Sequence, residues 1–197
     1  MTNDAPNSAM ADRRFAALSV TDESALARCA ARFAQRLRGV EYVALRGPLG
    51  SGKTSFTRAL LRALGHEGAV RSPTFTLVEP YDLGQLQVLH MDLYRLRNAH
   101  ELEMLGVREQ FGAAVLLIEW PENGVPWLPG ADVEIQFDYV VPAGEIAIAA
   151  SSSARALKVT ALTVLGEPLL AAFAAQSDGS AGLSTVDDSD SRAVAQS

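Results

Sequence analysis

Apolar residues recur with helical spacing in three segments of the chain. The first segment begins at Thr21, a capping residue followed by two acids, and ends at Gly39. Its predicted buried face consists of Leu26, Cys29, Ala30, Phe33 and Leu37. The second segment ends at Gly65, and its predicted buried face consists of Phe56, Leu60, Leu61 and Leu64. Residues 162–175 are the third predicted helix.

Shorter apolar runs between these helices have the length of strands. Residues 40–45, 87–91 and 115–118 are predicted as buried strands, and residues 75–81 alternate as a strand does. Two later segments also alternate and are predicted as antiparallel edge strands, residues 132–140 and 145–149. Because strands and helices interleave, the pattern predicts an α/β sheet with helices on both faces, in a strand order that it leaves open.

The length of 197 residues predicts one domain with flanking segments. We expect the domain to span residues 14–175, after a disordered polar start at residues 1–13. The last 22 residues, 176–197, hold six Ser, four Asp and one Arg, and supply −3 of the chain's net charge of −6. A segment with so little apolar surface to bury is expected to be a disordered tail.

Composition excludes several classes of function. With 17 basic and 23 acidic residues, the chain is a poor candidate for binding nucleic acid by itself. The single cysteine, Cys29, excludes an internal disulfide bond and a cysteine-based zinc site. No apolar run approaches the roughly 20 residues that span a bilayer, and the first residues lack the pattern of a secretion signal. We therefore expect a cytoplasmic protein that does not enter a membrane.

The segment G-P-L-G-S-G-K-T, residues 47–54, fits the phosphate-binding pattern G-x-x-x-x-G-K-[ST] between a predicted strand and a predicted helix. Glycines let the backbone N–H groups wrap an anion, and the helix N-terminus adds the positive end of its dipole. Lys53 is expected to bridge the β- and γ-phosphates of a nucleotide, and the Thr54 hydroxyl to ligate Mg²⁺. The alternative, a glycine-rich turn with a solvated lysine, is disfavoured by the flanking strand and helix. The predicted nucleotide-binding residues of this segment are Gly47, Pro48, Leu49, Gly50, Ser51, Gly52, Lys53, Thr54 and Ser55.

Two acidic residues stand where predicted buried strands end. Asp92 follows V-L-H-M, and Glu119 follows V-L-L-I. Since ligands bind at the carboxyl ends of strands in open α/β sheets, both carboxylates are expected at the phosphate site. One would hold Mg²⁺, directly or through water, and the other would orient or deprotonate the attacking water. The residues alone leave the division of roles between them open.

Five segments follow one another in an order that resembles the TsaE (YjeE) family over roughly residues 17–150. They are Gly47–Thr54, S-P-T-F at 72–75, D-L-Y-R-L at 92–96, L-G-V at 105–107 and I-E-W-P-E at 118–122. The resemblance implies a three-layer P-loop NTPase-like α/β fold, whose mixed sheet has a parallel core, antiparallel strands and flanking helices. It also implies an ATPase of the tRNA threonylcarbamoyladenosine (t6A) pathway that uses ATP and Mg²⁺. Such a protein acts with TsaB and TsaD, which modify adenosine 37 of tRNA, and meets tRNA only through that complex.

The resemblance also implies roles for individual residues. Lys53 becomes the phosphate lysine, Thr54 and Glu119 become Mg²⁺ ligands, and Asp92 becomes a catalytic acid near the γ-phosphate and the metal. Thr74 becomes a γ-phosphate sensor in a switch-like loop, with a strand-edge threonine as the alternative. These assignments give Lys53, Asp92 and Glu119 as the predicted catalytic residues.

Further motif residues have less definite roles. Trp120 is a candidate for packing over the nucleotide, at an interface or in the core, and Arg95 for stabilising charge or contacting a partner. The chain departs from the family at residues 142–146, P-A-G-E-I, where relatives commonly have an arginine. It also has Ser24 where relatives often have a threonine that helps to bind the base. His90 is expected to be a satisfied core histidine.

Three classes of function follow, of which the ATPase subunit of a tRNA-modifying assembly is the leading one. A small-molecule P-loop kinase shares the phosphate site, but the chain has no evident arginine-rich lid. A nucleotide-dependent switch without significant catalysis is the third class. Because no arginine finger is evident, we expect ATP hydrolysis by the isolated protein to be slow.

Overall fold

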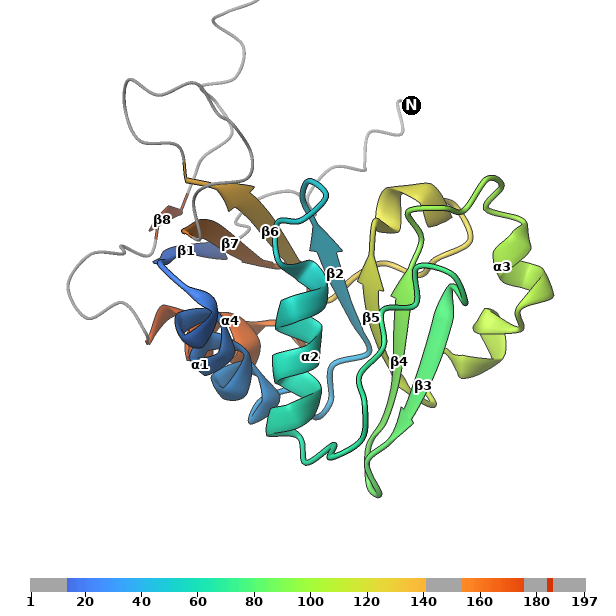
Figure 1. The fold of residues 1–197 in the computed structure, drawn as a ribbon, viewed down its shortest axis with the longest axis horizontal. Coiled ribbons are helices and arrows are strands. Elements are labelled where there is room, and N and C mark those ends of the chain that lie inside the picture. Colours follow the sequence, from blue (N-terminus) through green and yellow to red (C-terminus); the bar gives the residue numbers. More distant parts are fainter. Residues whose placement is uncertain (1–13, 141–153, 176–183, 186–197) are drawn as a thin grey trace, which may run out of the picture.

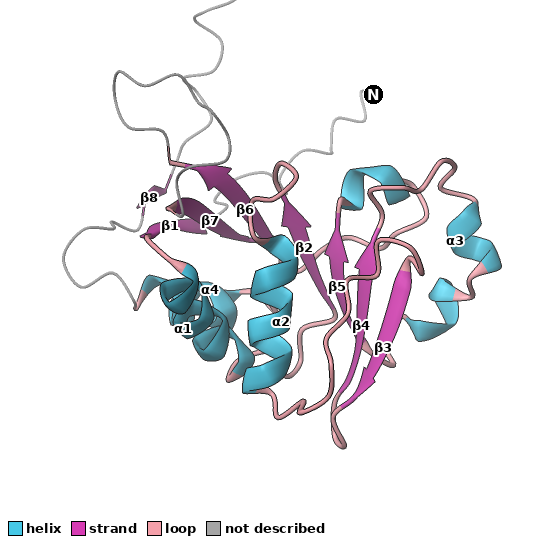
Figure 2. Ribbon diagram, in the orientation of Figure 1, coloured by secondary structure: helices cyan, strands magenta, loops and turns pink. Residues whose placement is uncertain are grey.

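The computed structural model describes residues 14–140, 154–175 and 184–185, and within them the strands form a single sheet (Figures 1 and 2). The strands are β1 (Arg14–Val20), β2 (Tyr42–Arg46), β3 (Val78–Asp82), β4 (Gln87–Asp92), β5 (Val115–Glu119), β6 (Val133–Tyr139), β7 (Arg155–Ala161) and β8 (Ser184–Thr185). Their order is β3-β4-β5-β2-β6-β7-β1-β8. The strands β4, β5, β2 and β6 are mutually parallel, and β3, β7, β1 and β8 join them by antiparallel pairing. The predicted mixed sheet with a parallel core is confirmed.

Helices cover both faces of this sheet, as predicted. The longer ones are α1 (Glu23–Ala34), α2 (Lys53–Ala63) and α4 (Glu167–Ala174), and the short ones are α3 (Glu101–Met104), η1 (Val107–Gln110) and η2 (Pro121–Gly124). Alternate residues of β2 enter two separate cores: Val43 packs with α1, α2 and α4, whereas Ala44 packs with α3 and η1. The three layers agree with the P-loop NTPase-like fold expected from the sequence.

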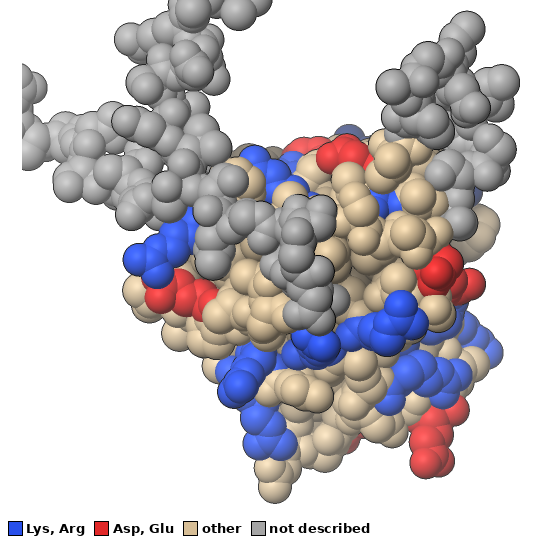
Figure 3. Space-filling view, turned by 90° about the vertical axis from the view of Figure 1, so that its left-hand side faces the viewer, with Lys and Arg blue, Asp and Glu red and all other residues tan. Residues whose placement is uncertain are grey.

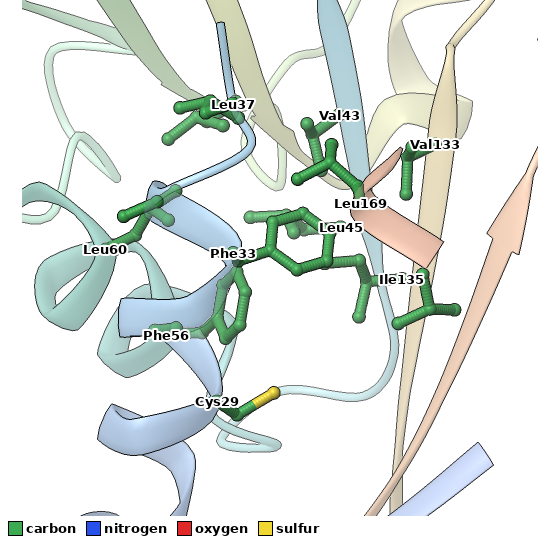
Figure 4. Close-up of a cluster of buried hydrophobic side chains, with 14 of the residues drawn as sticks. Cys29, Phe33, Leu37, Val43, Leu45, Phe56, Leu60, Val133, Ile135 and Leu169 are labelled. Carbon is green, nitrogen blue, oxygen red and sulfur yellow. The ribbon is translucent and has the colours of Figure 1, made fainter. Parts of the chain in front are cut away.

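The larger core lies between the central strands and α1, α2 and α4 (Figure 4). Cys29 and Phe33 of α1 meet Phe56 and Leu60 of α2 there, and Leu169 of α4 closes one side. The apolar faces predicted for the first two helices are therefore buried as expected, except that Leu64, beyond the end of α2, is only partly buried. Cys29 is buried and packs within this core.

Several element boundaries differ from the prediction for local reasons. The first helix stops at Ala34 rather than near Gly39, although Leu37 beyond its end is fully buried. The strand predicted from residue 75 starts at Val78, because a turn precedes it in which the Leu77 N–H bonds to the Pro73 carbonyl. The last helix starts at Glu167 rather than at 162, after a turn in which Thr163 bonds to Asp132.

The prediction of an edge strand at residues 132–140 is wrong. This segment forms β6, which lies inside the sheet, parallel to β2 and antiparallel to β7. Its alternation arises because Val133, Ile135 and Phe137 are fully buried while Glu134 and Gln136 stay partly exposed on the other face. The strand predicted at 145–149 lies outside the described residues, and β1 and β7 were not predicted at all.

Basic side chains gather in a band on the side of the molecule where α1 and α4 lie (Figure 3). α1 supplies Arg28 and Arg32, and Arg36 follows just beyond its end; the three are spaced four residues apart and are exposed. This face is therefore basic in a chain whose net charge is −6.

Candidate functional site

A glycine-rich loop, residues 47–52, connects the end of β2 to the start of α2. Gly47, Gly50 and Gly52 have φ values of 131°, 75° and 105°, which strongly favour glycine. A Cβ at Gly47 would collide with the Phe137 carbonyl of β6, so the close approach of the loop to the sheet also requires glycine. Gly52 is the N-cap of α2 and provides no side-chain cap. The first N–H groups of α2 thus remain available to an anion, as the motif predicts.

Lys53 is the first residue of α2, and its buried side chain bonds back to this loop. Its Nζ donates to the carbonyl oxygens of Gly47 at 2.7 Å and Pro48 at 2.9 Å, and lies 4.2 Å from the centroid of the Trp120 ring. Burial lowers the pKa of Lys53 from its usual 10.5, and the negative charges of Glu119 and Asp92 oppose that shift in part. The lysine is therefore a desolvated cation held at the mouth of the backbone loop.

A cavity of about 270 Å³ opens beside Lys53 at the carboxyl ends of the central strands. It brings together most of the predicted site residues from four separate segments of the chain. Its lining consists of Leu49, Gly50, Gly52, Lys53, Thr54, Ser55, Ser72, Thr74, Asp92, Tyr94, Glu119 and Trp120. The parallel register pairs Asp92 with Glu119, which places both acids at the same edge of the sheet as predicted from the strand ends.

Glu119 links the start of α2 to the neighbouring strand β4. The Thr54 hydroxyl donates to its two carboxylate oxygens, at 2.8 Å and 3.0 Å, and His90 Nε2 lies 2.9 Å from Oε1. The Glu119 side chain is almost fully buried. A hydroxyl and a carboxylate in contact at the end of a cavity are oxygen ligands of the kind that Mg²⁺ prefers.

Asp92, at the end of β4 beside Glu119, is held by the loop that contains Thr74. The Thr74 hydroxyl donates to Oδ2 at 2.7 Å, and the Tyr94 N–H donates to Oδ1 at 3.1 Å. Ser72 and Thr74 also share a hydrogen bond of 2.8 Å between their hydroxyls. The threonine that the family resemblance assigns to a switch-like loop is thus bonded to the second acid of the site.

Trp120 follows Glu119 in the left-handed conformation, with φ 57° and ψ 50°. Its N–H donates to the Leu45 carbonyl at 3.2 Å, and its ring centroid lies 5.0 Å from that of Tyr94. The ring is partly exposed and lines the cavity, so of the three roles open for Trp120 the structure excludes complete burial in the core.

A second cavity, of about 230 Å³, lies on the α1 side of the same loop. Gly50, Gly52 and Ser55 line both cavities, so the two share one wall. The Ser51 hydroxyl is buried there without a hydrogen-bond partner among the described residues, which fits a loop shaped around a ligand.

Arg155 lines this second cavity and was not predicted. Its Nε donates to the Ser51 carbonyl at 3.1 Å, and its guanidinium lies 4.8 Å from the centroid of the Tyr139 ring, whose hydroxyl donates to the Leu49 carbonyl. Relatives in the family commonly have an arginine at the positions of residues 142–146, which lie outside the described residues. The register of β6 with β7, which pairs Tyr139 with Arg155, brings this later arginine to the loop.

Some predicted residues do not line either cavity. The Arg95 guanidinium stacks over the exposed Phe75 ring at 4.4 Å, and the Ser24 hydroxyl donates to the Asp22 carboxylate at 2.6 Å. Gly47 and Pro48 take part through the carbonyls that bind Lys53. His90 is buried as expected but is not fully satisfied: its Nδ1 has no hydrogen-bond partner among the described residues, and the contact of its Nε2 with Glu119 was not predicted.

Two features that are absent from the described residues bear on the kind of site. They contain no group of three or more His, Cys, Asp and Glu side chains arranged to hold a metal ion. A metal at Thr54 and Glu119 would therefore take further ligands from water or from a bound molecule. None of the helices in these residues has the length and apolar character needed to cross a membrane.

The sheet order, the glycine loop and the acids at the strand ends define a P-loop NTPase-like protein. The crystal structure of YdiB from Bacillus subtilis has the same fold, with a TM-score of 0.67 and 24% identity over 83% of this chain and 97% of that one. Residues 20–143 match the family described as threonylcarbamoyl adenosine biosynthesis protein TsaE. The chain belongs to the TsaE family, and thereby to the biosynthesis of tRNA threonylcarbamoyladenosine.

Relatives named tRNA threonylcarbamoyladenosine biosynthesis protein TsaE support this assignment. The one from Haemophilus influenzae is 38% identical over 160 residues, which cover 78% of this chain and 94% of the relative. The one from Aquifex aeolicus is 42% identical over 99 residues, which cover 49% of this chain and 70% of the relative. The one from Bacillus subtilis is 38% identical over 115 residues, which cover 58% of this chain and 70% of the relative.

Proposed function

We propose that this chain is a Mg²⁺-dependent ATPase that acts in the cytoplasm with TsaD and TsaB in the threonylcarbamoylation of tRNA. The observation that carries the proposal is the contact between Thr54 and Glu119 beside the uncapped start of α2. That contact joins two metal-type oxygen ligands to an anion-binding helix terminus. Both are needed for a nucleotide that arrives with its metal ion.

The triphosphate binds in the first cavity against the backbone N–H groups of the loop. Lys53 exchanges the Gly47 and Pro48 carbonyls for phosphate oxygens, which bind a cation more strongly because they are charged. The nucleoside extends into the second cavity, where Arg155 and the Ser51 hydroxyl provide polar groups.

Thr54 and Glu119 hold the Mg²⁺ ion, with Asp92 as the nearby second acid. Bound Mg²⁺ neutralises the charge that develops on the phosphate oxygens during transfer. The Asp92 carboxylate, fixed by Thr74 and by the Tyr94 N–H, orients the attacking water and accepts its proton. The Thr74 hydroxyl reports the γ-phosphate when it leaves Asp92 to bind a phosphate oxygen instead.

Hydrolysis depends on the partner proteins because, among the described residues that line the first cavity, Lys53 is the one cation available to the transition state. No arginine is among its described lining residues. A positive side chain supplied by another subunit is worth a large factor in P-loop enzymes. The TsaB–TsaD pair therefore accelerates turnover, and this chain meets tRNA only through that complex.

Calorimetry with Mg-ADP on purified variants tests nucleotide binding. Lys53→Ala is expected to weaken the affinity by about 10- to 100-fold, because it removes a charge-assisted contact to phosphate. Lys158→Ala is the matched control, since Lys158 is the other lysine of the chain and lies over Phe15, far along the sheet. Absence of Mg-dependent binding by the unaltered protein would refute the proposal.

Steady-state hydrolysis, with and without TsaB and TsaD, tests catalysis. Glu119→Gln is expected to lower the Mg-ADP affinity by about 10- to 100-fold and turnover by more than that, because it retains a hydrogen-bonding group but loses the charge of a metal ligand. Equal rates with and without the pair would contradict partner control. ATP consumption that rises with a small acceptor and phosphorylates it would indicate a kinase instead.

A further inference from the structure

His90 is a buried histidine with a single polar contact. It lies in β4 with no exposed surface, between the buried apolar residues Leu89 and Met91. Its Nε2 lies 2.9 Å from Glu119 Oε1, whereas its Nδ1 is buried without any hydrogen-bond partner among the described residues. Buried polar atoms are nearly always paired, so the unpaired nitrogen requires an explanation.

A purely structural role does not account for this side chain. An apolar residue of similar size would fill the same place in the core without leaving a buried nitrogen unpaired. The one interaction that an apolar residue would lose is the contact with Glu119. The sheet favours that contact, because His90 lies two residues before Asp92, the partner of Glu119 in the register of β4 and β5, and therefore on the same face.

We infer that His90 is a positioning residue that fixes the Glu119 carboxylate for the metal site. The ring carries its proton on Nε2, because Glu119 is the acceptor there and Nδ1 faces none. Oε1 then accepts hydrogen bonds from His90 and Thr54, while Oε2 accepts only the longer one from Thr54 within the described residues. The inference rests on the proposed function for the metal, but the orientation of the histidine ring does not.

The contact gives Glu119 a support that does not depend on Thr54. A metal ligand at Thr54 must release or share its bond to the carboxylate, whereas the buried histidine keeps its own. A donor behind a ligating side chain fixes its rotamer, and loss of such a partner commonly costs 10- to 100-fold in metal affinity. His90 thus acts through Glu119 and does not touch the nucleotide.

Three substitutions separate this role from simple packing. His90→Gln places an amide nitrogen near the position of Nε2, His90→Asn places one only near Nδ1, and His90→Leu fills the core without a donor. The readout is the affinity for a fluorescent N-methylanthraniloyl ADP, with Mg²⁺ and with EDTA, because the ratio isolates the metal contribution. We expect the ratio to fall by about 10- to 100-fold in the Asn and Leu variants and to change less than about threefold in the Gln variant.

The outcomes are distinct. Retention of the Mg²⁺ ratio by His90→Leu would overturn the inference while leaving the proposed function intact, and so would a ranking of the variants by side-chain volume. Absence of any Mg²⁺ effect in the unaltered protein would refute the proposed function instead.

The tautomer provides a test that needs neither metal nor a variant. In the ¹⁵N-histidine-labelled protein, a proton found on Nε2 supports the inference, and a proton found on Nδ1 of His90 overturns it, even if His90→Leu and His90→Asn do not fold.

Discussion

Lys53 places a buried positive charge in the site. Its ammonium group is removed from water and surrounded by two carbonyls and the face of an indole ring, none of which carries a full charge. Burial therefore lowers the pKa of Lys53, and the nearby carboxylates only partly restore it. A phosphate group would favour the charged form much more strongly than these neutral partners do.

The affinity for Mg-ADP is consequently expected to fall as the pH rises toward and through the lowered pKa of Lys53, beginning below its usual 10.5. Above that pKa the loss approaches about tenfold per pH unit. Calorimetry between about pH 7 and pH 10 measures it, with Lys53→Arg as the control, because a guanidinium stays charged over this range. The arginine variant is expected to bind more weakly but without this fall; parallel curves for the two proteins would contradict the assignment.

The contribution of Lys53 to the free energy of unfolding changes with pH in the opposite direction to its contribution to nucleotide affinity. Because burial holds the pKa of folded Lys53 below the unfolded value, the unfolded chain binds more protons between the two values. The contribution of Lys53 to the free energy of unfolding therefore increases as the pH rises through that range.

The residues of the site that could be predicted are those whose role follows from their neighbours in the sequence. The loop at 47–54 and the acids Asp92 and Glu119 follow from local patterns and from the ends of strands. Tyr139 and Arg155 could not be found in this way, because only the pairing of β6 with β2, and of β7 with β6, brings them to the loop. The role of His90 was missed for a related reason: a histidine among apolar residues has the pattern of a core position, and its partner lies on another strand.

The helix α2 connects the glycine-rich loop, residues 47–52, to the core. Phe56, in the first turn after the loop, packs edge to face against Phe33 of α1 at 5.6 Å and against Phe137 of β6 at 5.7 Å between ring centroids. These contacts hold the N-terminus of α2 against the sheet. They also position the Phe137 carbonyl close to Gly47, so that packing and loop geometry are fixed together.

Replacement of this ring tests the connection. Phe56→Ala is expected to lower the free energy of unfolding by about 3–5 kcal/mol, because it removes a fully buried ring between two others. Urea denaturation measures the change. Phe56→Leu, which keeps most of the volume, serves as the control and is expected to cost less than half as much. A loss below about 1 kcal/mol for the alanine variant would show that the helix does not depend on this contact.

Elements with strong periodicity were predicted well, and those whose pattern is dominated by small residues were not. α1 and α2 have wide apolar stripes and clear starts, and their predicted faces are buried. β1 and β7 read R-F-A-A-L-S-V and R-A-L-K-V-T-A, in which alanine obscures the alternation that marks a strand. Such strands are defined by the neighbours that pair with them, which sequence alone does not supply.

The whole molecule places one polar edge of the sheet between two apolar cores. The cavity lies where β2, β4 and β5 end, and buried side chains fill both faces below it. Asp132 ties the other end of the sheet, since its carboxylate accepts from the Glu41 and Tyr42 N–H groups and from Thr163. A ligand at the polar edge is therefore linked to the stability of the entire domain.

Mg-ADP at about 100 times its dissociation constant is expected to raise the free energy of unfolding by about 2.7 kcal/mol. Urea denaturation with and without the nucleotide measures the effect. Lys158→Ala should show the same increase, and Lys53→Ala, with an affinity about 10- to 100-fold weaker, should show only about 0.4–1.4 kcal/mol at the same concentration. An equal increase in both variants would mean that the nucleotide binds elsewhere.

The shared wall of the two cavities has a consequence for how affinity is built up. A ligand that fills both cavities loses translational freedom once on binding, whereas two separate fragments each lose their own. Inorganic triphosphate and adenosine should then each bind weakly. ATP, which joins the two covalently, should have an association constant far larger than the product of their separate association constants. Much of the selectivity for an intact nucleotide would accordingly come from connectivity rather than from any single contact.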